Sequence, residues 1–209
     1  MNSKKIPQAV ISRLFIYLRE LTELAKVKIT TISSAELGDR TNLSDAQVRK
    51  DLGYFGNFGV SGSGYAVNEL VEALEKILGK NKVWNVALVG TGHLGSALLS
   101  YPGFKSHGLN IVSAFDISPK RIGKAIGDIK VKPLEDIKKE ISGKKIEIGI
   151  ITVPAKSAQS VCDKLIESGI ECILNFAPVA LNAAENIKIR DVDLSREIET
   201  LSYFLVNKK

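Results

Sequence analysis

The chain has 209 residues, of which 44% are apolar and 25% are charged, and its formal net charge is +6. This length suits one or two domains, and a mean hydropathy near zero with a normal charge density excludes a disordered or fibrous chain. No apolar run reaches the roughly 18 residues that a membrane span requires, so we expect a cytoplasmic protein without a membrane partner.

The N-terminal part of the chain has the pattern of short helices. Apolar residues recur at helical spacing over residues 10–26. Ser33–Glu36 has the S-x-x-E form of a capping box and predicts a second helix, and Ser44–Gln47 repeats the device as S-x-x-Q. A third helix is therefore expected through about Gly53, followed by a glycine-rich hairpin and a fourth helix over residues 68–79.

The second and third helices have the dimensions of a helix-turn-helix, and the hairpin after them would be a wing. On the third helix, Val48 and Leu52 are expected to face the core, which directs Lys50 outward with Gln47 and Arg49 on its flanks. Glutamine can bond adenine, and arginine or lysine can bond guanine or phosphate, so this helix is a candidate for reading DNA. The alternative is an ordinary solvated helix face.

From residue 83 onward, apolar strands alternate with amphipathic helices, which predicts an α/β domain with a parallel sheet covered on both faces. Its two cysteines, Cys162 and Cys172, lack the spacing of metal ligands, and we expect structural thiols and no metal site. The expected strands cover residues 83–89, 110–115, 147–153, 172–176 and 187–192, with helices near 134–141, 155–168 and 194–206.

A glycine-rich loop, Gly90-Thr91-Gly92-His93-Leu94-Gly95, follows the first of these strands and opens a helix. Asp116 ends the next strand, 21 residues after Gly95, as in dinucleotide-binding folds. The glycines permit a tight turn, close approach of a pyrophosphate and close packing of the helix. Because Asp116 can accept both ribose hydroxyls and would repel a 2′-phosphate, the pattern predicts NAD(H) rather than NADP(H). The alternatives are a plain turn or a pocket for another nucleotide such as coenzyme A.

An enzyme of this class needs a proton donor or acceptor beside the nicotinamide. The chain has two histidines: His93 lies inside the phosphate loop, and His107 lies in a polar connector. Little chain remains for a substrate domain, so we expect no catalysis. A small NAD(P)-dependent oxidoreductase is the alternative.

Several motifs, in the same order along nearly the whole chain, resemble the Rex family of redox-sensing transcriptional repressors. They are Gln47-Val48-Arg49-Lys50-Asp51-Leu52-Gly53-Tyr54-Phe55-Gly56, Phe58-Gly59, Gly62, Gly64-Tyr65, the loop Gly90–Gly95, Tyr101-Pro102-Gly103-Phe104, Thr152-Val153-Pro154 and Asn175-Phe176-Ala177-Pro178.

The resemblance implies a homodimer with a winged-helix DNA-binding domain (1–80), a Rossmann-like NAD(H)-binding domain (81–192) and a C-terminal helix (193–209) exchanged between subunits. Its partners would be palindromic operator DNA and a second copy of the chain, and its cofactors NADH and NAD⁺. The residues themselves agree, because the last helix carries an apolar stripe that must be buried somewhere. The stripe consists of Leu194, Ile198, Leu201 and Leu205, and packing within the chain is the alternative.

The expected sites divide into three groups. Cofactor contacts are expected from Gly90, Thr91, Gly92, His93, Leu94, Gly95, Tyr101, Asp116, Thr152, Val153, Pro154, Asn175 and Phe176. DNA contacts are expected from Ser44, Gln47, Arg49, Lys50, Tyr54, Ser61 and Ser63. The wing, Gly59–Gly64, lacks the basic residue found in several relatives, which leaves hydroxyl or backbone contacts to phosphate.

By resemblance, Arg19, Tyr101 and Asp193 form a polar set that changes with the cofactor, and the matching aspartate could instead be Asp191. The alternative for Arg19 is a surface ion pair with Glu23. NAD⁺ and NADH differ at the nicotinamide ring, and an apolar pocket disfavours the cationic form. Candidates for that pocket are Val153, Pro154, Phe176, Ala177 and Pro178, with Tyr101 and Phe104.

The sequence thus favours a repressor that binds its operator when NADH is low and dissociates when NADH binds. A regulator that senses another nucleotide is a further alternative to the oxidoreductase.

Overall fold

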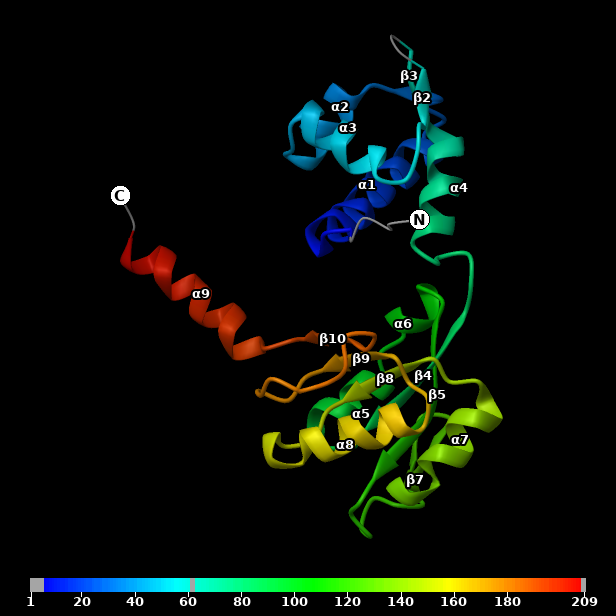
Figure 1. The fold of residues 1–209 in the computed structure, drawn as a ribbon, viewed down its shortest axis with the longest axis vertical. Coiled ribbons are helices and arrows are strands. Elements are labelled where there is room, and N and C mark those ends of the chain that lie inside the picture. The colour runs from blue at the N-terminus through cyan, green and yellow to red at the C-terminus, as the bar shows by residue number, and fades with distance from the viewer. Residues whose placement is uncertain (1–5, 61–62, 208–209) are drawn as a thin grey trace. The chain divides into compact units, whose positions relative to one another are not determined.

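The computed structural model describes residues 6–60 and 63–207, and the chain divides into two units at the junction of Lys82 and Val83 (Figure 1). Each unit has its own hydrophobic core. Within the described ranges, no helix is long and apolar enough to cross a membrane.

The first unit is a set of four helices with a small antiparallel sheet. The helices are α1 (Gln8–Lys26), α2 (Ser34–Thr41), α3 (Asp45–Gly53) and α4 (Val67–Ile77). The strands are β1 (Thr31–Ile32), β2 (Gly59–Val60) and β3 (Gly64–Ala66), in the order β1-β3-β2. The hairpin of β2 and β3 directly follows α3, which is the order of a winged helix.

Local capping signals explain where two of these helices begin. The capping box predicted at Ser33 and Glu36 is present in both directions, because each side chain bonds the other residue's backbone N–H. Ser44 caps α3 by accepting from the backbone N–H of Gln47, at 3.2 Å. The expected return contact from the Gln47 side chain is wrong, since that amide donates to Asp51 instead.

The second unit is built on a sheet with the strand order β10-β9-β8-β4-β5-β7-β6, in which every pairing except that of β6 with β7 is parallel. Its strands are β4 (Trp84–Val89), β5 (Leu109–Asp116), β6 (Ala125–Ile126), β7 (Ile129–Pro133), β8 (Ile148–Ile151), β9 (Cys172–Asn175) and β10 (Lys188–Asp191). Its helices are α5 (His93–Leu99), α6 (Gly103–Ser106), the 3₁₀ turn η1 (Leu134–Asp136), α7 (Ile137–Lys144), α8 (Ala155–Glu167) and α9 (Leu194–Val206).

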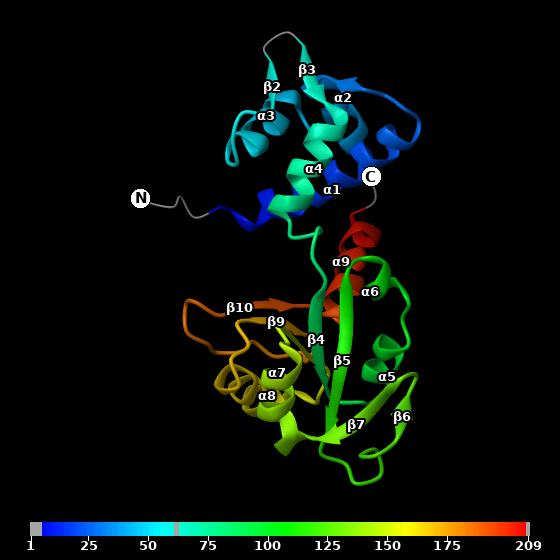
Figure 2. The ribbon, with the colours of Figure 1, turned by 90° about the vertical axis from the view of Figure 1, so that its right-hand side faces the viewer.

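The alternation of side chains along β4 decides which helices cover which face of the sheet. Ala87 and Val89 pack in one core with α7 and α8, and Val86 and Leu88 pack in another against Leu98 of α5. Figure 2 shows α7 and α8 on one side of the sheet and α5 on the other. The sequence predicts a helix near residues 134–141 but no strand between residues 116 and 147, and the structure adds the short hairpin of β6 and β7 there.

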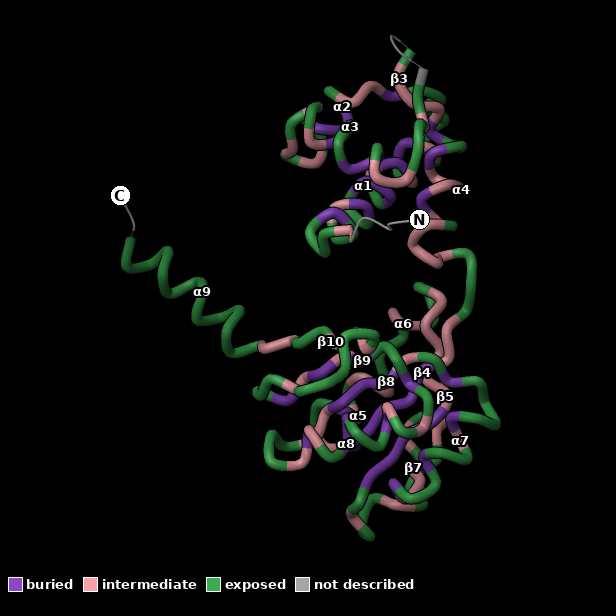
Figure 3. The backbone as a smooth tube through the Cα atoms, in the orientation of Figure 1, coloured by how far each residue is buried: buried purple, intermediate pink, exposed green. Residues whose placement is uncertain are grey.

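The last helix, α9, follows the edge strand β10 and buries none of its side chains (Figure 3). The four residues of the predicted stripe are 55–69% exposed. The alternative of packing within the chain is therefore not found among the described residues. An apolar helix face left open in this way needs a partner.

Candidate functional site

The glycine-rich loop joins β4 to α5, and two of its glycines have no room for a side chain. Gly90 has φ of +98°, and a Cβ there would lie 2.7 Å from the carbonyl oxygen of Thr152. A Cβ on Gly95 would collide with the carbonyl oxygen of Gly90. The hydroxyl of Thr152 donates to that same carbonyl, at 2.6 Å, and ties the loop to the residue that follows β8. No side chain caps the first turn of α5, so its N–H groups face the space above the loop.

Asp116 lies at the end of β5 and holds the loop from the other side. One carboxylate oxygen accepts from the backbone N–H and the hydroxyl of Thr91, both at 2.8 Å, and from Arg121, at 3.3 Å. The second oxygen accepts from the backbone N–H of Ser118, at 2.9 Å. Burial by itself would raise the pKa of Asp116, but these hydrogen bonds outweigh it and lower the pKa below its ordinary value. Asp116 is therefore an anion at neutral pH.

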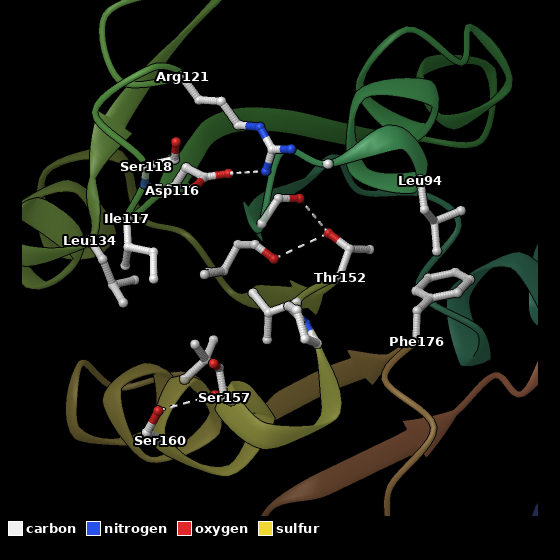
Figure 4. A pocket seen from close by; sticks show the side chains of 16 residues that line it. Leu94, Asp116, Ile117, Ser118, Arg121, Leu134, Thr152, Ser157, Ser160 and Phe176 are labelled. Carbon is white, nitrogen blue, oxygen red and sulfur yellow. Dashed lines mark hydrogen bonds and ion pairs between the residues drawn. The ribbon is translucent and has the colours of Figure 1, made fainter.

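A pocket of about 580 Å³ opens beside this loop, at the carboxyl ends of β4, β5 and β8. In an open α/β sheet this is where ligands bind, because the connections diverge there. Figure 4 shows Asp116 and Arg121 at one end of the pocket and Leu94 and Phe176 at the other, with Thr152 between them. The pocket is thus polar where an adenosine ribose is expected and apolar at the opposite end.

The structure brings part of the expected cofactor site together. The expected residues that line the pocket are Gly90, Gly92, Leu94, Asp116, Thr152, Val153, Pro154 and Phe176. Ser118, Arg121 and Leu134 line it as well, although the motif does not point to them. Arg121 carries a signal that sequence reasoning missed, namely a basic residue five positions after the acid that ends β5.

Five expected residues do not line this pocket. Within the loop sequence, Thr91 and Gly95 are buried, and His93 is exposed on α5. Tyr101 lies along a separate groove of about 780 Å³, where its ring meets Phe104 edge to face with centroids 5.3 Å apart. Asn175 is fully buried.

Asn175 holds the chain after β9 rather than facing the pocket. Its side-chain nitrogen donates to the carbonyl oxygens of Ala177 and Val179, and its oxygen accepts from the backbone N–H of Ala177. The same nitrogen donates to Asp191, at 2.8 Å. Asp193 instead caps α9 through the N–H groups of its first turn. The two aspartates considered for the switch therefore differ in role, since Asp191 fastens β10 to β9 and Asp193 begins the last helix.

Helix α3, which is expected to read DNA, presents one unpaired cation. Lys50 is exposed and makes no hydrogen bond or ion pair with any residue of the described ranges. Arg49 is also exposed, but its guanidinium donates to Asp45, at 2.6 Å, and to the hydroxyl of Ser34, at 3.0 Å. Val48 faces the core as predicted.

A buried carboxylate on α3, which sequence reasoning missed, ties this helix to α1. Asp51 is fully buried and accepts four hydrogen bonds: two from Arg13, at 2.5 and 2.8 Å, one from the hydroxyl of Tyr17, at 2.8 Å, and one from Gln47, at 2.7 Å. Burial by itself would raise the pKa of Asp51, but these donors outweigh it and lower the pKa. Burial and the bond to Asp51 raise the pKa of Tyr17.

The same contacts correct the prediction for Gln47. The spacing predicts its amide as a base reader, yet in the structure the amide nitrogen is engaged by Asp51 inside the unit. Asp51 itself could have been suspected, because it is an acid that lies between the two core positions Val48 and Leu52 on a helix.

Next to α3, a groove of about 560 Å³ runs between the helix and the wing, lined among others by Arg49, Asn57 and Tyr65. Of the remaining expected DNA contacts, Ser63 is exposed at the turn of the hairpin and Tyr54 is half-buried at the end of α3. Ser61 lies outside the described residues.

Arg19 projects from α1 with 73% of its side chain exposed. The alternative ion pair with Glu23 is wrong, because Glu23 pairs with Lys26 at 2.7 Å. The nearest carboxylate to Arg19 is that of Glu20, at 3.7 Å, which leaves its guanidinium accessible. Among residues 6–60 and 63–207, no cluster of histidine, cysteine, aspartate or glutamate could hold a metal ion.

Comparison with known proteins places both units in known families. The model of a "CoA binding domain" matches residues 81–179, and that of a "putative DNA-binding protein N-terminus" matches residues 5–53. The redox-sensing transcriptional repressor Rex of Desulforamulus reducens is 46% identical over 209 residues, which is all of both chains. That of Pelotomaculum thermopropionicum is 46% identical over the whole of this chain and 98% of its own.

Solved structures agree with these relatives. The crystal structure of RSP in complex with β-NAD⁺ and operator DNA has a TM-score of 0.91 and 40% identity, and the match covers 97% of this chain and 93% of that one. The structure of RSP with β-NADH has a TM-score of 0.84 and 38% identity, covering 97% and 95%. With a glycine loop and acid in one unit, a winged helix in the other, and relatives of this identity along its whole length, the chain belongs to the Rex family of redox-sensing transcriptional repressors.

Proposed function

We propose that this chain represses transcription by binding palindromic operator DNA when NADH is scarce, and that it leaves the operator when NADH binds. In this proposal residues 1–80 bind DNA, residues 81–192 bind the dinucleotide, and residues 193–209 pair two subunits. As a member of the Rex family the chain is a transcriptional repressor and not an enzyme. RSP, its relative, was crystallised with β-NAD⁺ and operator DNA, and also with β-NADH.

The single observation that carries the proposal is the polarity of the pocket. At one end the Asp116 carboxylate and the side-chain-free backbone at Gly90 suit a ribose and a pyrophosphate. At the other end Leu94 and Phe176 offer an apolar wall. NAD⁺ and NADH share every group except the nicotinamide ring, which is cationic only in NAD⁺. Because removing a cation from water is costly, this wall favours NADH.

A ligand shifts an equilibrium between two arrangements only by its difference in affinity for them. A difference of about 1–3 kcal/mol between NADH and NAD⁺ would couple DNA binding to the cofactor by about 5- to 150-fold. We propose Arg19, Tyr101 and Asp193 as the polar contacts that change in this transition. Arg19 is accessible on α1 and Tyr101 is 58% exposed, so both are free to engage a partner.

On the DNA side, we propose contacts from the unpaired Lys50 and from Arg49, Ser44, Tyr54 and Ser63, and also from Ser61, which lies outside the described residues. A lone lysine on the outer face of the recognition helix suits a phosphate or a guanine edge. Asp45 neutralises much of the Arg49 charge in the unbound state, so Arg49 must exchange that partner to contact DNA.

The proposed self-association is supported by the apolar surface of α9. Seven large apolar side chains of this helix are 55–83% exposed. We propose that this helix inserts between the two units of a second copy. A symmetric dimer would then present two recognition helices to the two halves of a palindrome.

The test is a titration of labelled operator with the full chain at one fixed salt concentration, because salt alone changes such affinities strongly. NADH is expected to weaken operator binding, and NAD⁺ at the same saturation is expected not to. Equal effects of the two dinucleotides would refute the redox role. Displacement by coenzyme A in place of NADH would favour a regulator of another nucleotide class, and turnover of NADH with a carbonyl substrate would favour an oxidoreductase.

A further inference from the structure

Asp116 has too few free acceptor positions to bind a ribose diol in the arrangement seen here. A carboxylate offers about four lone-pair positions, two on each oxygen. Three donors already meet on one oxygen, from Thr91 twice and from Arg121 once, and Ser118 occupies part of the other. Thr91 donates from its backbone N–H and from its buried hydroxyl, and Ser118 donates from its backbone N–H. Arg121 makes the longest of these contacts, at 3.3 Å, and its side chain is 47% exposed, so it is the partner that a ligand displaces most readily.

Arg121 lies over the phosphate loop as well as beside Asp116. A Cβ built on Gly92 would be 3.9 and 4.0 Å from the two terminal nitrogens of its guanidinium. The side chain is 47% exposed, and it reaches into the pocket from the segment after β5 (Figure 4). Among the described residues that line the pocket, Asp116 and Arg121 are the only charged ones. A single cation thus stands where both the ribose edge and the pyrophosphate are expected.

We propose that Arg121 is a specificity-determining residue, which binds a 2′-phosphate on the adenosine ribose whenever Asp116 does not hold it. This inference rests on the proposed dinucleotide function. The preference for NADH over NADPH is then determined by Asp116 and Arg121 together and not by Asp116 alone. The Asp116 carboxylate repels the 2′-phosphate. It also holds Arg121, which among the described residues of the pocket is the one cation that could neutralise that phosphate. The ribose diol of NADH, being neutral, displaces Arg121 from Asp116 without such repulsion.

The experiment measures the affinities of NADH and NADPH for the full chain in separate calorimetric titrations, because the two reduced dinucleotides have the same fluorescence. The variants are Asp116→Ser, Arg121→Ala, the double variant, and Lys120→Ala as a matched control. Lys120 is the adjacent exposed cation and does not line the pocket. The readout is the ratio of the two affinities, so that a general weakening of the loop cancels.

Asp116→Ser is expected to raise the NADPH-to-NADH affinity ratio, and adding Arg121→Ala should remove about 10- to 100-fold of that ratio, as for a charge-assisted hydrogen bond. Lys120→Ala should leave the ratio unchanged. An equal ratio in Asp116→Ser with and without Arg121 would overturn the inference. An effect of Lys120→Ala as large as that of Arg121→Ala would overturn it too, since general charge would then explain the result.

Because Asp116 also anchors Thr91 and Ser118, the serine variant could fail to fold. In that case Asp116→Asn takes its place, because the amide keeps an acceptor oxygen for Thr91 without the charge, and an equal NADPH-to-NADH affinity ratio with and without Arg121 in that background would overturn the inference. A wild-type chain that binds neither dinucleotide would refute the proposed function itself. If the wild-type chain binds NADH but the NADPH-to-NADH affinity ratio of the Asp116 variant is the same with and without Arg121, only this inference is refuted.

Discussion

The buried carboxylate of Asp51 offers a sharp test of how the recognition helix is held. All four of its contacts are donors, from Arg13, Tyr17 and Gln47. Asp51→Asn keeps the shape but replaces one acceptor oxygen by an N–H₂ group, which then faces donors. Breaking a buried charged pair costs about 3–5 kcal/mol. Since 23% of the Arg13 side chain is exposed to water, we expect the lower end, about 3 kcal/mol.

For a unit of this size, a loss of 1 kcal/mol lowers the melting temperature by about 4–8 °C, so the expected shift is about 12–24 °C. Far-ultraviolet circular dichroism follows the helices of both units, and the first unit contributes its four helices to the signal. The fluorescence of Trp84, the single tryptophan, reports the second unit, and its transition and the NADH affinity should not move. Operator affinity should fall, because α3 loses its tie to α1.

Asp39→Asn is the matched control, since Asp39 is exposed on α2. An Asp51→Asn variant as stable as this control would refute the assigned role of the network. The pH dependence gives a second check. The folded pKa of Asp51 is lowered, so its stabilisation is complete above the unfolded value of about 3.9 and is lost as the pH falls below it. The stability gap between wild type and Asp51→Asn should therefore narrow below about pH 4.

Three variants test the other parts of the proposal. Lys50→Ala should weaken operator binding and reduce the slope of log affinity against log salt by about one, with NADH affinity intact; an unchanged slope would remove Lys50 from the phosphate contacts. Phe176→Ser should narrow the difference between NADH and NAD⁺ affinities in calorimetry by about fivefold or more, because a polar wall tolerates the cation; a wider gap would contradict the pocket assignment. Ile198→Glu combined with Leu201→Glu should convert a dimer to a monomer in light scattering and abolish operator binding, whereas an unchanged mass would exclude α9 from the subunit contact.

Local signals allowed much of this architecture to be predicted from the sequence. The helix beginning at Ser33, the core positions Val48 and Leu52, and the parallel strands with their glycine loop depend on residues near one another in the chain. The capping box is short-range in this sense, and periodicity alone identifies a buried face. The resemblance to the family depends on the same motifs.

Only the tertiary structure decided the partners of the polar side chains. Asp51 meets Arg13 from 38 positions away, which no local pattern indicates, whereas its contact with Gln47 is an i,i+4 pair on one helix. The bond between Asn175 and Asp191, 16 positions apart on neighbouring strands, is of the same kind. A polar residue on a helix or at a strand end can face water or a buried donor with equal local preference. Which of the two occurs depends on what the rest of the chain packs against it, because a buried charge is stable only when it is paired.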